Sequence, residues 1–270
     1  MPGPANQPSA KRFRDRYGPW ALVTGAAQGI GRAFADALAT RGLHVVLVDV
    51  QAQVIAAAAR EIAALNGVET RNVAADLSDR EFIAPVLSQL DDLEIGLVIC
   101  NAAIGQQGPF LEEPLDALHR AIDLNCAAAV TLTRAFAPAM LERGRGGLIL
   151  IASGTALQGS PNYANYAATK AFNLSLGESL HYELKEQGVD VLSYIPGPTN
   201  TPGLRSSLPG LKEGIEVGAI RLARPTAEAA LKALGALATA ARQPGHSRRL
   251  AARRRAAEHA IEARRARESK

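Results

Sequence analysis

The stretch Thr24-Gly25-Ala26-Ala27-Gln28-Gly29-Ile30-Gly31 follows a short apolar run, residues 20–24, and leads into a helical pattern over residues 30–41. Glycines at these places let the backbone turn tightly and approach a ligand closely. The helix that follows offers free N–H groups and the positive end of its dipole to a pyrophosphate. Glycine also ends strands for purely structural reasons, so it is the position between a strand and a helix that predicts a dinucleotide site.

The rest of residues 19–241 alternates short apolar runs with longer helical patterns. This alternation is typical of a parallel sheet with crossover helices, so we predict an α/β fold with one doubly wound parallel sheet in a single domain. Ser78-Asp79-Arg80-Glu81 has the sequence of a capping box and is expected to start a helix that ends near Leu90. We expect strands over 20–24, 45–49, 69–74, 97–101, 147–152 and 189–195, and further helices over 52–65, 114–143 (with a break near Asn125) and 166–187.

The composition is that of an ordinary globular chain. With 270 residues, 47% hydrophobic content and a mean hydropathy near zero, the chain can bury a substantial core and needs no transmembrane span. Residues 1–18 are rich in Pro, Gly and charge and lack an apolar centre, so we expect no export signal and a cytoplasmic location. Cys100 and Cys126 lie in apolar runs without metal-ligand or disulfide spacing, which predicts buried, reduced thiols and no metal site.

The net charge of +4 is unevenly distributed. Residues 242–270 carry ten Arg and Lys against three Glu, a net +7, which leaves the remainder of the chain near −3. This basic tail reads as a helix with only Leu250 and Ile261 as large apolar residues, too few for strong membrane insertion. We expect a solvated or subunit-packing helix and no nucleic-acid or membrane contact, with a specific protein contact or polyanion binding as the alternatives.

Tyr166 and Lys170 form the strongest candidate for chemistry. Residues four apart on a helix lie on the same face, so a phenol and an ammonium at this spacing point into one site. A nearby cation favours the phenolate, which predicts a lowered pKa for Tyr166 and suits it to acid/base work. The alternative is an ordinary helix whose Tyr and Lys share a face by chance, and the other motifs of the chain decide between the two.

Further motifs follow in a fixed order: Thr24-Gly-x-x-x-Gly29-Ile-Gly31, Asn101-Ala102-Ala103, Asn125, Ser153, Tyr166-x-x-x-Lys170 and Pro196-Gly197. In order and approximate spacing, the chain resembles the short-chain dehydrogenase/reductase family over about residues 19–235. The resemblance implies a Rossmann-type fold, a nicotinamide cofactor, and hydride transfer to or from a carbonyl/alcohol pair.

The resemblance assigns a catalytic role to four residues. Tyr166 would exchange a proton with the substrate oxygen, and Lys170 would hold the nicotinamide ribose and keep the Tyr166 pKa low. Ser153 would donate a hydrogen bond to the substrate oxygen. Asn125 would interrupt its helix and hold a water that links Lys170 to solvent. The alternatives are that Ser153 is a strand-end cap and Asn125 a satisfied buried amide.

Cofactor choice depends on Asp49, at the end of the second expected strand. A carboxylate there accepts hydrogen bonds from the adenosine ribose hydroxyls and repels a 2′-phosphate, so we predict NAD rather than NADP. Gln28 and Val50 fill the places where NADP-preferring relatives usually carry Arg or Lys. The cofactor contacts that the motifs imply are Gly25, Gln28, Gly29, Ile30, Gly31, Asp49, Asp76, Leu77, Asn101, Ala102, Ala103, Tyr166, Lys170, Pro196, Gly197, Thr199 and Thr201.

One position departs from the family pattern, because Ala103 stands where the family usually has Gly. Ala disfavours positive φ, so we expect a conventional backbone there.

The substrate pocket is expected beside a lid over about residues 202–222. Its predicted lining residues are mostly apolar, which favours a neutral, moderately hydrophobic secondary alcohol or ketone, although Arg205 and Lys212 in the lid could favour an anion. The predicted lining residues of the substrate pocket are Thr155, Leu157, Gln158, Tyr163 and Leu204.

The leading functional hypothesis is therefore an NAD-dependent dehydrogenase/reductase, with an NADP-dependent carbonyl reductase as one alternative. A second alternative belongs to another class: a non-catalytic nucleotide-sensing or polyanion-binding regulator that keeps the fold and uses the basic tail. The complete Tyr, Lys, Ser and Asn set argues against it, because a sensor needs no proton relay. The resemblance also implies a homodimer or homotetramer that pairs through the helices over 115–143 and 166–187.

Overall fold

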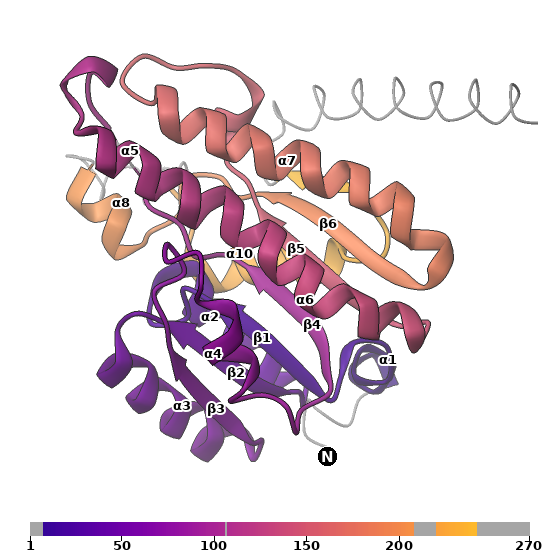
Figure 1. Ribbon diagram of the computed structural model, residues 1–270. Helices are drawn as coiled ribbons and strands as arrows, with labels where there is room; N and C mark the ends of the chain where they lie inside the picture. Colours follow the sequence, from indigo (N-terminus) through magenta and orange to yellow (C-terminus); the bar gives the residue numbers. More distant parts are fainter. Residues whose placement is uncertain (1–7, 106, 208–219, 242–270) are drawn as a thin grey trace, which may run out of the picture.

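In the computed structural model, which describes residues 8–105, 107–207 and 220–241, one twisted sheet runs through the molecule (Figure 1). Within this part of the chain the sheet has seven parallel strands in the order β3-β2-β1-β4-β5-β6-β7. The predicted doubly wound, Rossmann-type fold is thus confirmed. The strands are β1 (Trp20–Thr24), β2 (His44–Asp49), β3 (Thr70–Ala74), β4 (Ile95–Cys100), β5 (Gly146–Ile151), β6 (Val189–Ile195) and β7 (Thr239–Ala241).

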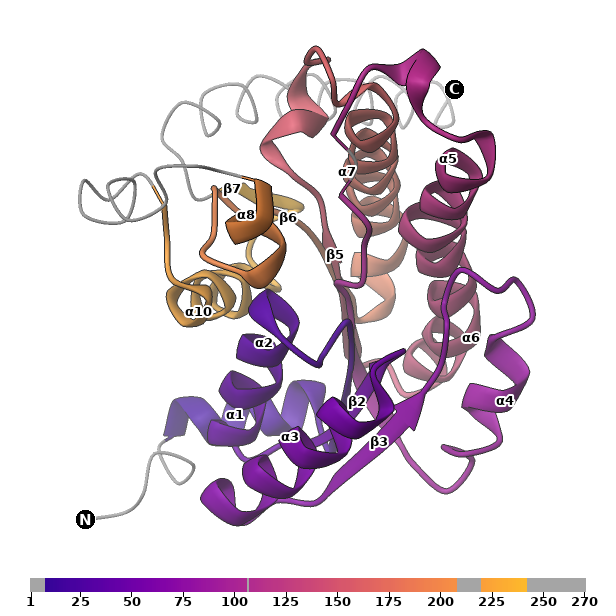
Figure 2. The ribbon, with the colours of Figure 1, turned by 90° about the vertical axis from the view of Figure 1, so that its left-hand side faces the viewer.

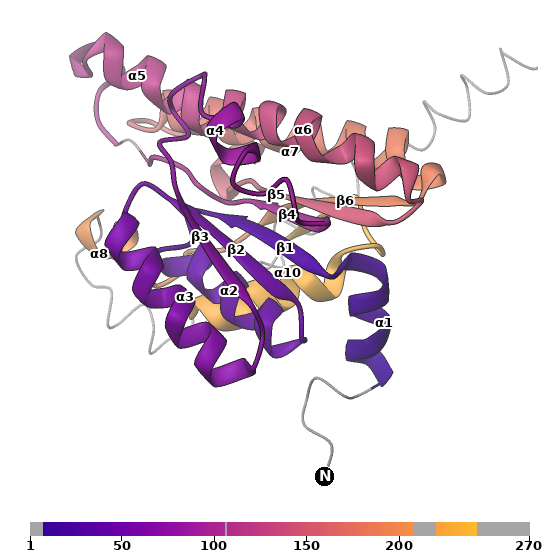
Figure 3. The same cartoon turned by 60° about the horizontal axis from the view of Figure 1, so that its bottom comes forward.

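Helices cover both faces of the sheet, and Figures 2 and 3 show the sheet between the two layers. Every residue of β1, β4, β5 and β6 is buried, which explains why these strands read as continuous apolar runs. One layer is built from α2 (Gly29–Thr40), α3 (Ala52–Asn66) and α10 (Ala223–Ala233), and the other from α4 (Ile83–Leu87), α6 (Ala128–Glu142) and α7 (Ala164–Leu184).

Three elements differ from the expectation. The strand β7 pairs with β6 at Ser193 and Thr239 but was not predicted, because Thr-Ala-Ala carries no strand-like alternation. The predicted capping box is wrong: α4 begins only at Ile83, and the amide of Glu81 bonds the carboxylate of Asp79 in a local turn. Near the amino terminus, α1 (Pro8–Tyr17) forms in a segment with no clear helical pattern in its residues.

The long helical pattern before β5 is broken where expected. Here α5 (Leu115–Ile122) passes into a π-helical segment, Asp123–Ala127, before α6 continues. By length and composition alone, the helical stretch 115–142 could cross a membrane, since an 18-residue window within it has a mean hydropathy of 1.3. Half of that window is buried inside the fold, as in a core helix: Leu132, Phe136 and Met140 pack in the core between this helix and the sheet.

The helix α1 is fixed to the amino-terminal edge of the sheet. The Tyr17 hydroxyl donates a 2.8 Å hydrogen bond to Asp190 Oδ2 at the start of β6, and Arg16 Nε donates to the same oxygen at 3.0 Å. Tyr17 and Asp190 are both buried. This edge lies opposite the carboxyl ends of the strands, so α1 supports the sheet from the side away from the site.

Candidate active site

The glycine-rich turn joins the end of β1 to the start of α2. Gly25 and Gly29 have φ values of +64° and +63°, which side chains rarely adopt. A Cβ on Gly31 would collide with the carbonyl oxygen of Gly25, so only glycine lets α2 start this close to the strand. The free N–H groups of the first turn of α2 therefore lie against the loop, as a pyrophosphate site requires.

A hydrogen-bond network ties the ends of β1 and β4 together. The Thr24 hydroxyl donates to the carbonyl of Ile99 and accepts from the amides of Asn101 and Ala102. The Asn101 side chain donates to the carbonyls of Thr24, at 2.9 Å, and Gly25, at 3.3 Å. Asn101 therefore acts in this structure as the tie that shapes the glycine-rich turn.

Asp49 lies at the end of β2, beside the same turn. Its Oδ2 accepts a 3.1 Å hydrogen bond from the amide of Ala27, and its Oδ1 accepts from the amide of Gln51. Gln28 and Val50 are exposed at this end of the sheet. The carboxylate is thus held by the backbone at the position where an adenosine ribose is bound in folds of this kind.

Asp76 and Leu77 divide their roles. The Asp76 carboxylate accepts hydrogen bonds from the amide and hydroxyl of Ser78. Its Oδ2 also forms an ion pair with Arg120 Nη2, at 2.9 Å. The Ser78 hydrogen bonds, together with Arg120, lower the pKa of Asp76. Leu77 is buried in the core, so its side chain serves packing. Of the two, only Asp76 presents a polar side chain for a ligand to contact.

The turn after β6 comes back to the glycine-rich loop. A Cβ on Gly29 would lie only 3.1 Å from Thr201 Cγ2, so these two segments are in contact. The Thr201 hydroxyl accepts a hydrogen bond from the amide of Leu204 in α8 (Pro202–Ser207), and the buried Thr199 hydroxyl donates to the carbonyl of Gly197. The structure thereby brings the predicted Pro196-Gly197 turn to the predicted phosphate site.

Tyr166 and Ser153 meet at the carboxyl end of β5. The Ser153 hydroxyl accepts a 3.3 Å hydrogen bond from the amide of Thr155, and it lies close enough to the Tyr166 phenol to lower its pKa. Burial raises the pKa of Tyr166 against the lowering effect of Ser153. The expectation of a lowered pKa for Tyr166 is therefore wrong, because the loss of water on burial is the largest effect and favours the neutral phenol.

Lys170 is buried one turn further along α7. Its Nζ donates a 3.0 Å hydrogen bond to the carbonyl of Ile151 and lies 5.7 Å from the centre of the Tyr166 ring. Burial lowers the pKa of Lys170 to about 8. The thiol of Cys126 is close enough to oppose this shift, and burial raises the pKa of Cys126 itself to about 11. Cys100 and Cys126 are both buried free thiols, as predicted.

Asn125 lies in the π-helical segment and is fully engaged. Its Oδ1 accepts from the amide of Ile104 at 2.8 Å, and its Nδ2 donates to the Ile104 carbonyl and to the Thr169 hydroxyl. Its own carbonyl accepts a 2.8 Å hydrogen bond from Asn173 Nδ2. The side chain is therefore a satisfied buried amide, one of the two possibilities considered, and the role of holding a water stays a prediction.

Ala103 has a conventional backbone, because Asn162 is the only non-glycine residue with positive φ among the described residues. This agrees with the expectation for the Ala at this position.

The segment Gly108 to Glu113 folds over the amino end of α7, and the amide of Gly108 donates a 2.9 Å hydrogen bond to the carbonyl of Asn162.

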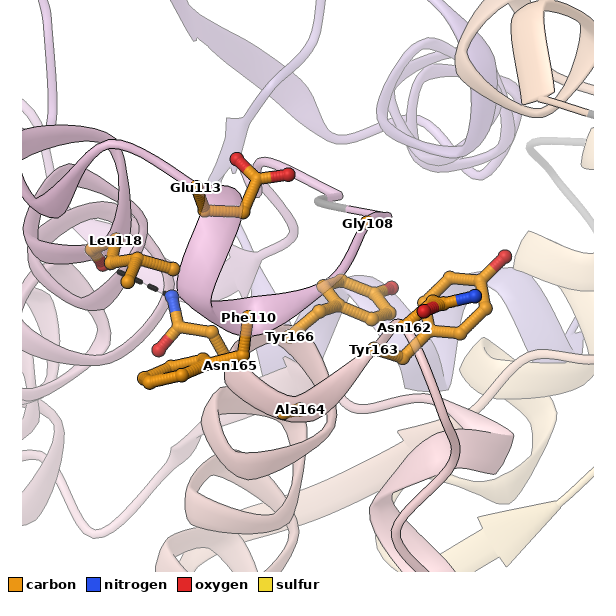
Figure 4. A pocket seen from close by; sticks show the side chains of 9 residues that line it. All are labelled: Gly108, Phe110, Glu113, Leu118, Asn162, Tyr163, Ala164, Asn165 and Tyr166. Carbon is orange, nitrogen blue, oxygen red and sulfur yellow. Dashed lines mark hydrogen bonds between the residues drawn. The ribbon is translucent and has the colours of Figure 1, made fainter.

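A small hollow opens beside Tyr166, with an empty volume of about 210 Å³ that includes the solvent at its mouth (Figure 4). Of the predicted substrate residues only Tyr163 lines it, with its ring centre 6.4 Å from that of Tyr166. Thr155, Leu157, Gln158 and Leu204 lie outside it and remain predictions. The lining residues are Gly108, Phe110, Glu113, Leu118, Asn162, Tyr163, Ala164, Asn165 and Tyr166.

Two parts of the site were missed from the sequence. The buried Asn173, whose amide reaches the carbonyl of Asn125, sits three residues after Lys170 and could have been marked as a polar residue on the same helix face. Phe110 and Glu113 gave no signal, because nothing local shows that their loop returns to α7. Lys212 and the basic tail lie outside the described residues.

The fold and the site together define a dinucleotide-binding protein of the doubly wound α/β class, with a Ser, a Tyr and a Lys at the carboxyl edge of the sheet. Comparison with known proteins then gives the family. The family profile described as short chain dehydrogenase matches residues 19–212, and the chain belongs to this family of NAD(P)-dependent oxidoreductases.

Three proteins illustrate the range of its relatives. The chain is 36% identical over 184 residues to inactive hydroxysteroid dehydrogenase-like protein 1 of Pongo abelii, which covers 67% of this chain and 56% of that protein's length. It is 32% identical over 210 residues to the 7beta-hydroxysteroid dehydrogenase of Collinsella aerofaciens, covering 78% and 80%. A solved short-chain dehydrogenase from Sphingobium yanoikuyae in complex with NADPH has a TM-score of 0.79 at 28% identity, covering 90% and 95%.

We predict that Lys170→Met makes the protein without cofactor more stable at neutral pH. The Lys170 pKa falls from 10.5 to about 8 on folding, so between these values the unfolded chain holds more protons and the free energy of unfolding of the natural protein rises with pH. The variant should be more stable by about 1–3 kcal/mol at pH 7, and the difference should shrink as the pH rises from 8 to 10.5. Chemical unfolding at several pH values measures this.

Lys185→Met, at an exposed position near the end of the same helix, is the control and should show no such pH-dependent gain. A Lys170→Met variant that is less stable at neutral pH would show that the hydrogen bond to the Ile151 carbonyl outweighs the burial of the charge.

Proposed function

We propose that the protein transfers a hydride between a nicotinamide cofactor and a neutral, moderately hydrophobic secondary alcohol or ketone. The observation that carries the proposal is the position of Ser153 close to the Tyr166 phenol, with Lys170 buried one helical turn away. These three side chains lie together at the carboxyl end of β5. The proposal is supported at the family level by oxidoreductase relatives.

The residues of the cofactor cradle fit a dinucleotide. A Cβ at Gly31 would fill the space between the loop and α2, and Asp49 offers a carboxylate at the ribose position. We assign the remaining contacts to Asp76, Asn101 and Thr201, beside the backbone of the loop. A nicotinamide bound here would supply or accept the hydride.

In the direction of reduction, the carbonyl gains a hydride at carbon and a proton at oxygen, which gives the alcohol. Ser153 donates a hydrogen bond to the carbonyl oxygen and orients it, and Tyr166 gives the proton. Because burial raises the pKa of Tyr166, the phenol holds its proton at neutral pH. Lys170, with a pKa of about 8, exchanges a proton near neutral pH and serves the relay behind Tyr166.

Replacing Tyr166 by Phe tests this assignment. We expect kcat for a bulky secondary alcohol or ketone to fall at least about 100-fold, because the general acid is lost. Tyr163→Phe is the matched control, since this residue lines the hollow without bonding Ser153, and it should keep kcat within about tenfold. NADH or NADPH absorbance follows both reactions. Equal rates for Tyr166→Phe and the natural protein would remove the enzyme assignment.

A second candidate function is that of a non-catalytic nucleotide-binding regulator. The name of the Pongo abelii relative, which calls that protein inactive, favours this candidate. This chain nevertheless keeps Tyr166, Lys170, Ser153 and Asn125 together. Cofactor binding without turnover of any alcohol or ketone would favour the regulator.

We further propose NAD as the preferred cofactor. Asp49 carries a fixed negative charge at the ribose end, where a 2′-phosphate would be repelled. Replacing Asp49 by Ser together with Val50 by Arg should shift the ratio of kcat/KM for NAD to that for NADP by about 10- to 100-fold toward NADP, because Arg pairs with phosphate. Val50→Ala alone is the control. A natural protein that already prefers NADP, as the NADPH complex of the Sphingobium relative would suggest, would overturn the proposal.

We also propose a homo-oligomer that pairs through the α5–α6 helix and α7. Leu115, Ile122, Val130 and Phe172 expose large apolar side chains on these helices. Light scattering should give the mass of two or four subunits, and the mass of one subunit would contradict the proposal.

A further inference from the structure

The hollow beside Tyr166 contains one charged side chain, Glu113. Its other lining residues are apolar, aromatic or amide. Glu113, Gly108 and Tyr166 are among the labelled residues of Figure 4 that line this hollow. A carboxylate in such surroundings accepts hydrogen bonds and offers no donor, so it selects groups that donate.

The Glu113 carboxylate is held near the hollow without a partner of its own. No hydrogen bond or ion pair joins it to any of residues 8–105, 107–207 or 220–241. A Cβ on Gly108 would lie only 2.7 Å from Glu113 Oε1, so the glycine leaves the space that the carboxylate occupies. By contrast, Asp36 and Asp190 are each bonded to an arginine.

The walls of the hollow are tied to the helix that carries Tyr166. Asn165 Nδ2 donates a 3.1 Å hydrogen bond to the carbonyl of Leu118 in α5, and the amide of Gly108 donates to the carbonyl of Asn162. Asn162 adopts a φ of +63°, a left-handed conformation that Asn tolerates and that bends the chain into α7. The segments on either side of Glu113 are therefore tied to the helix that carries Tyr166 before a ligand arrives.

The remaining surface is apolar. Phe110 is 50% exposed in the protein without ligand, and Tyr163 and Leu118 form the adjoining walls. A ligand with an apolar body would cover Phe110, and a ligand that brought no donor would leave the Glu113 carboxylate with less water and no partner.

We propose that this hollow is the outer part of the substrate site and that Glu113 selects apolar ketones and alcohols that carry a second hydroxyl group, remote from the reacting carbon. Glu113 accepts the hydrogen bond of that hydroxyl and takes no part in hydride or proton transfer. The inference rests on the proposed oxidoreductase function and narrows its substrate class.

Three ketones of one skeleton test the inference: phenylcyclohexanone, its para-hydroxy derivative and its para-methoxy derivative. The hydroxy compound donates a hydrogen bond, whereas the methoxy compound fills similar space without donating. Affinity by calorimetry, with cofactor present, and kcat/KM are both measured. We expect the natural protein to favour the hydroxy compound over the methoxy compound by about tenfold or more, the range for a hydrogen bond to a charged group.

Glu113→Met removes the acceptor at similar volume and should abolish this preference, and it should raise the affinity for phenylcyclohexanone, because no carboxylate then loses water to a ligand that brings no donor. Glu113→Gln should reduce the preference, because the hydrogen bond loses its charge. Glu112→Gln, at the exposed neighbouring residue, is the matched control and should retain it. A preference that is absent in the natural protein, or that survives in Glu113→Met, would overturn the inference.

Failure of the proposed function gives a different result. If the hydroxy compound binds in a Glu113-dependent way but neither nicotinamide supports turnover, the hollow is a binding site as inferred and the oxidoreductase assignment falls. If the ketones are turned over without discrimination, the oxidoreductase stands and the role of Glu113 falls. If none of the three binds, the inference about this hollow is overturned.

Discussion

The close approach of β1 and β4 at their carboxyl ends is the constraint on which the site depends. The Thr24 hydroxyl and the Asn101 side chain hold the two strand ends and the glycine-rich loop together. From there the connection continues: Ile104 is bonded to Asn125, Asn125 to the Thr169 hydroxyl, and that hydroxyl to the Tyr166 carbonyl. One series of hydrogen bonds thus joins the phosphate end of the site to its catalytic end.

The positions of the site residues could be predicted from the sequence, but the pKa of the catalytic tyrosine could not. The doubly wound parallel sheet, the break at Asn125 and the meeting of Ser153 with Tyr166 follow from patterns that repeat along the chain or lie at fixed spacings. The pKa of Tyr166 does not, because it depends on how much water is lost when α7 packs on β5 and β6. Sequence spacing places Lys170 near the phenol but says nothing of this desolvation, which has the opposite effect on the Tyr166 pKa.

Most of the other features that were not predicted depend on contacts between segments far apart in the sequence. The loop with Phe110 and Glu113 meets α7 some fifty residues later, and no local pattern records that contact. The strand β7 is defined only by β6, which supplies its hydrogen-bond partners. In the segment 78–81, the Asp79 carboxylate accepts a hydrogen bond from the amide of Glu81 and so stabilises a local turn in place of the first turn of a helix.

The anchoring of α1 has a consequence for how the protein is made. Tyr17 and its acceptor Asp190 are separated by 173 positions in the chain. During synthesis the amino-terminal helix therefore emerges long before β6 leaves the ribosome, and until then its buried tyrosine has no acceptor at this site. The helix is therefore made well before the strand that holds it, so α1 reaches its final place only after β6 has been made and has joined the sheet.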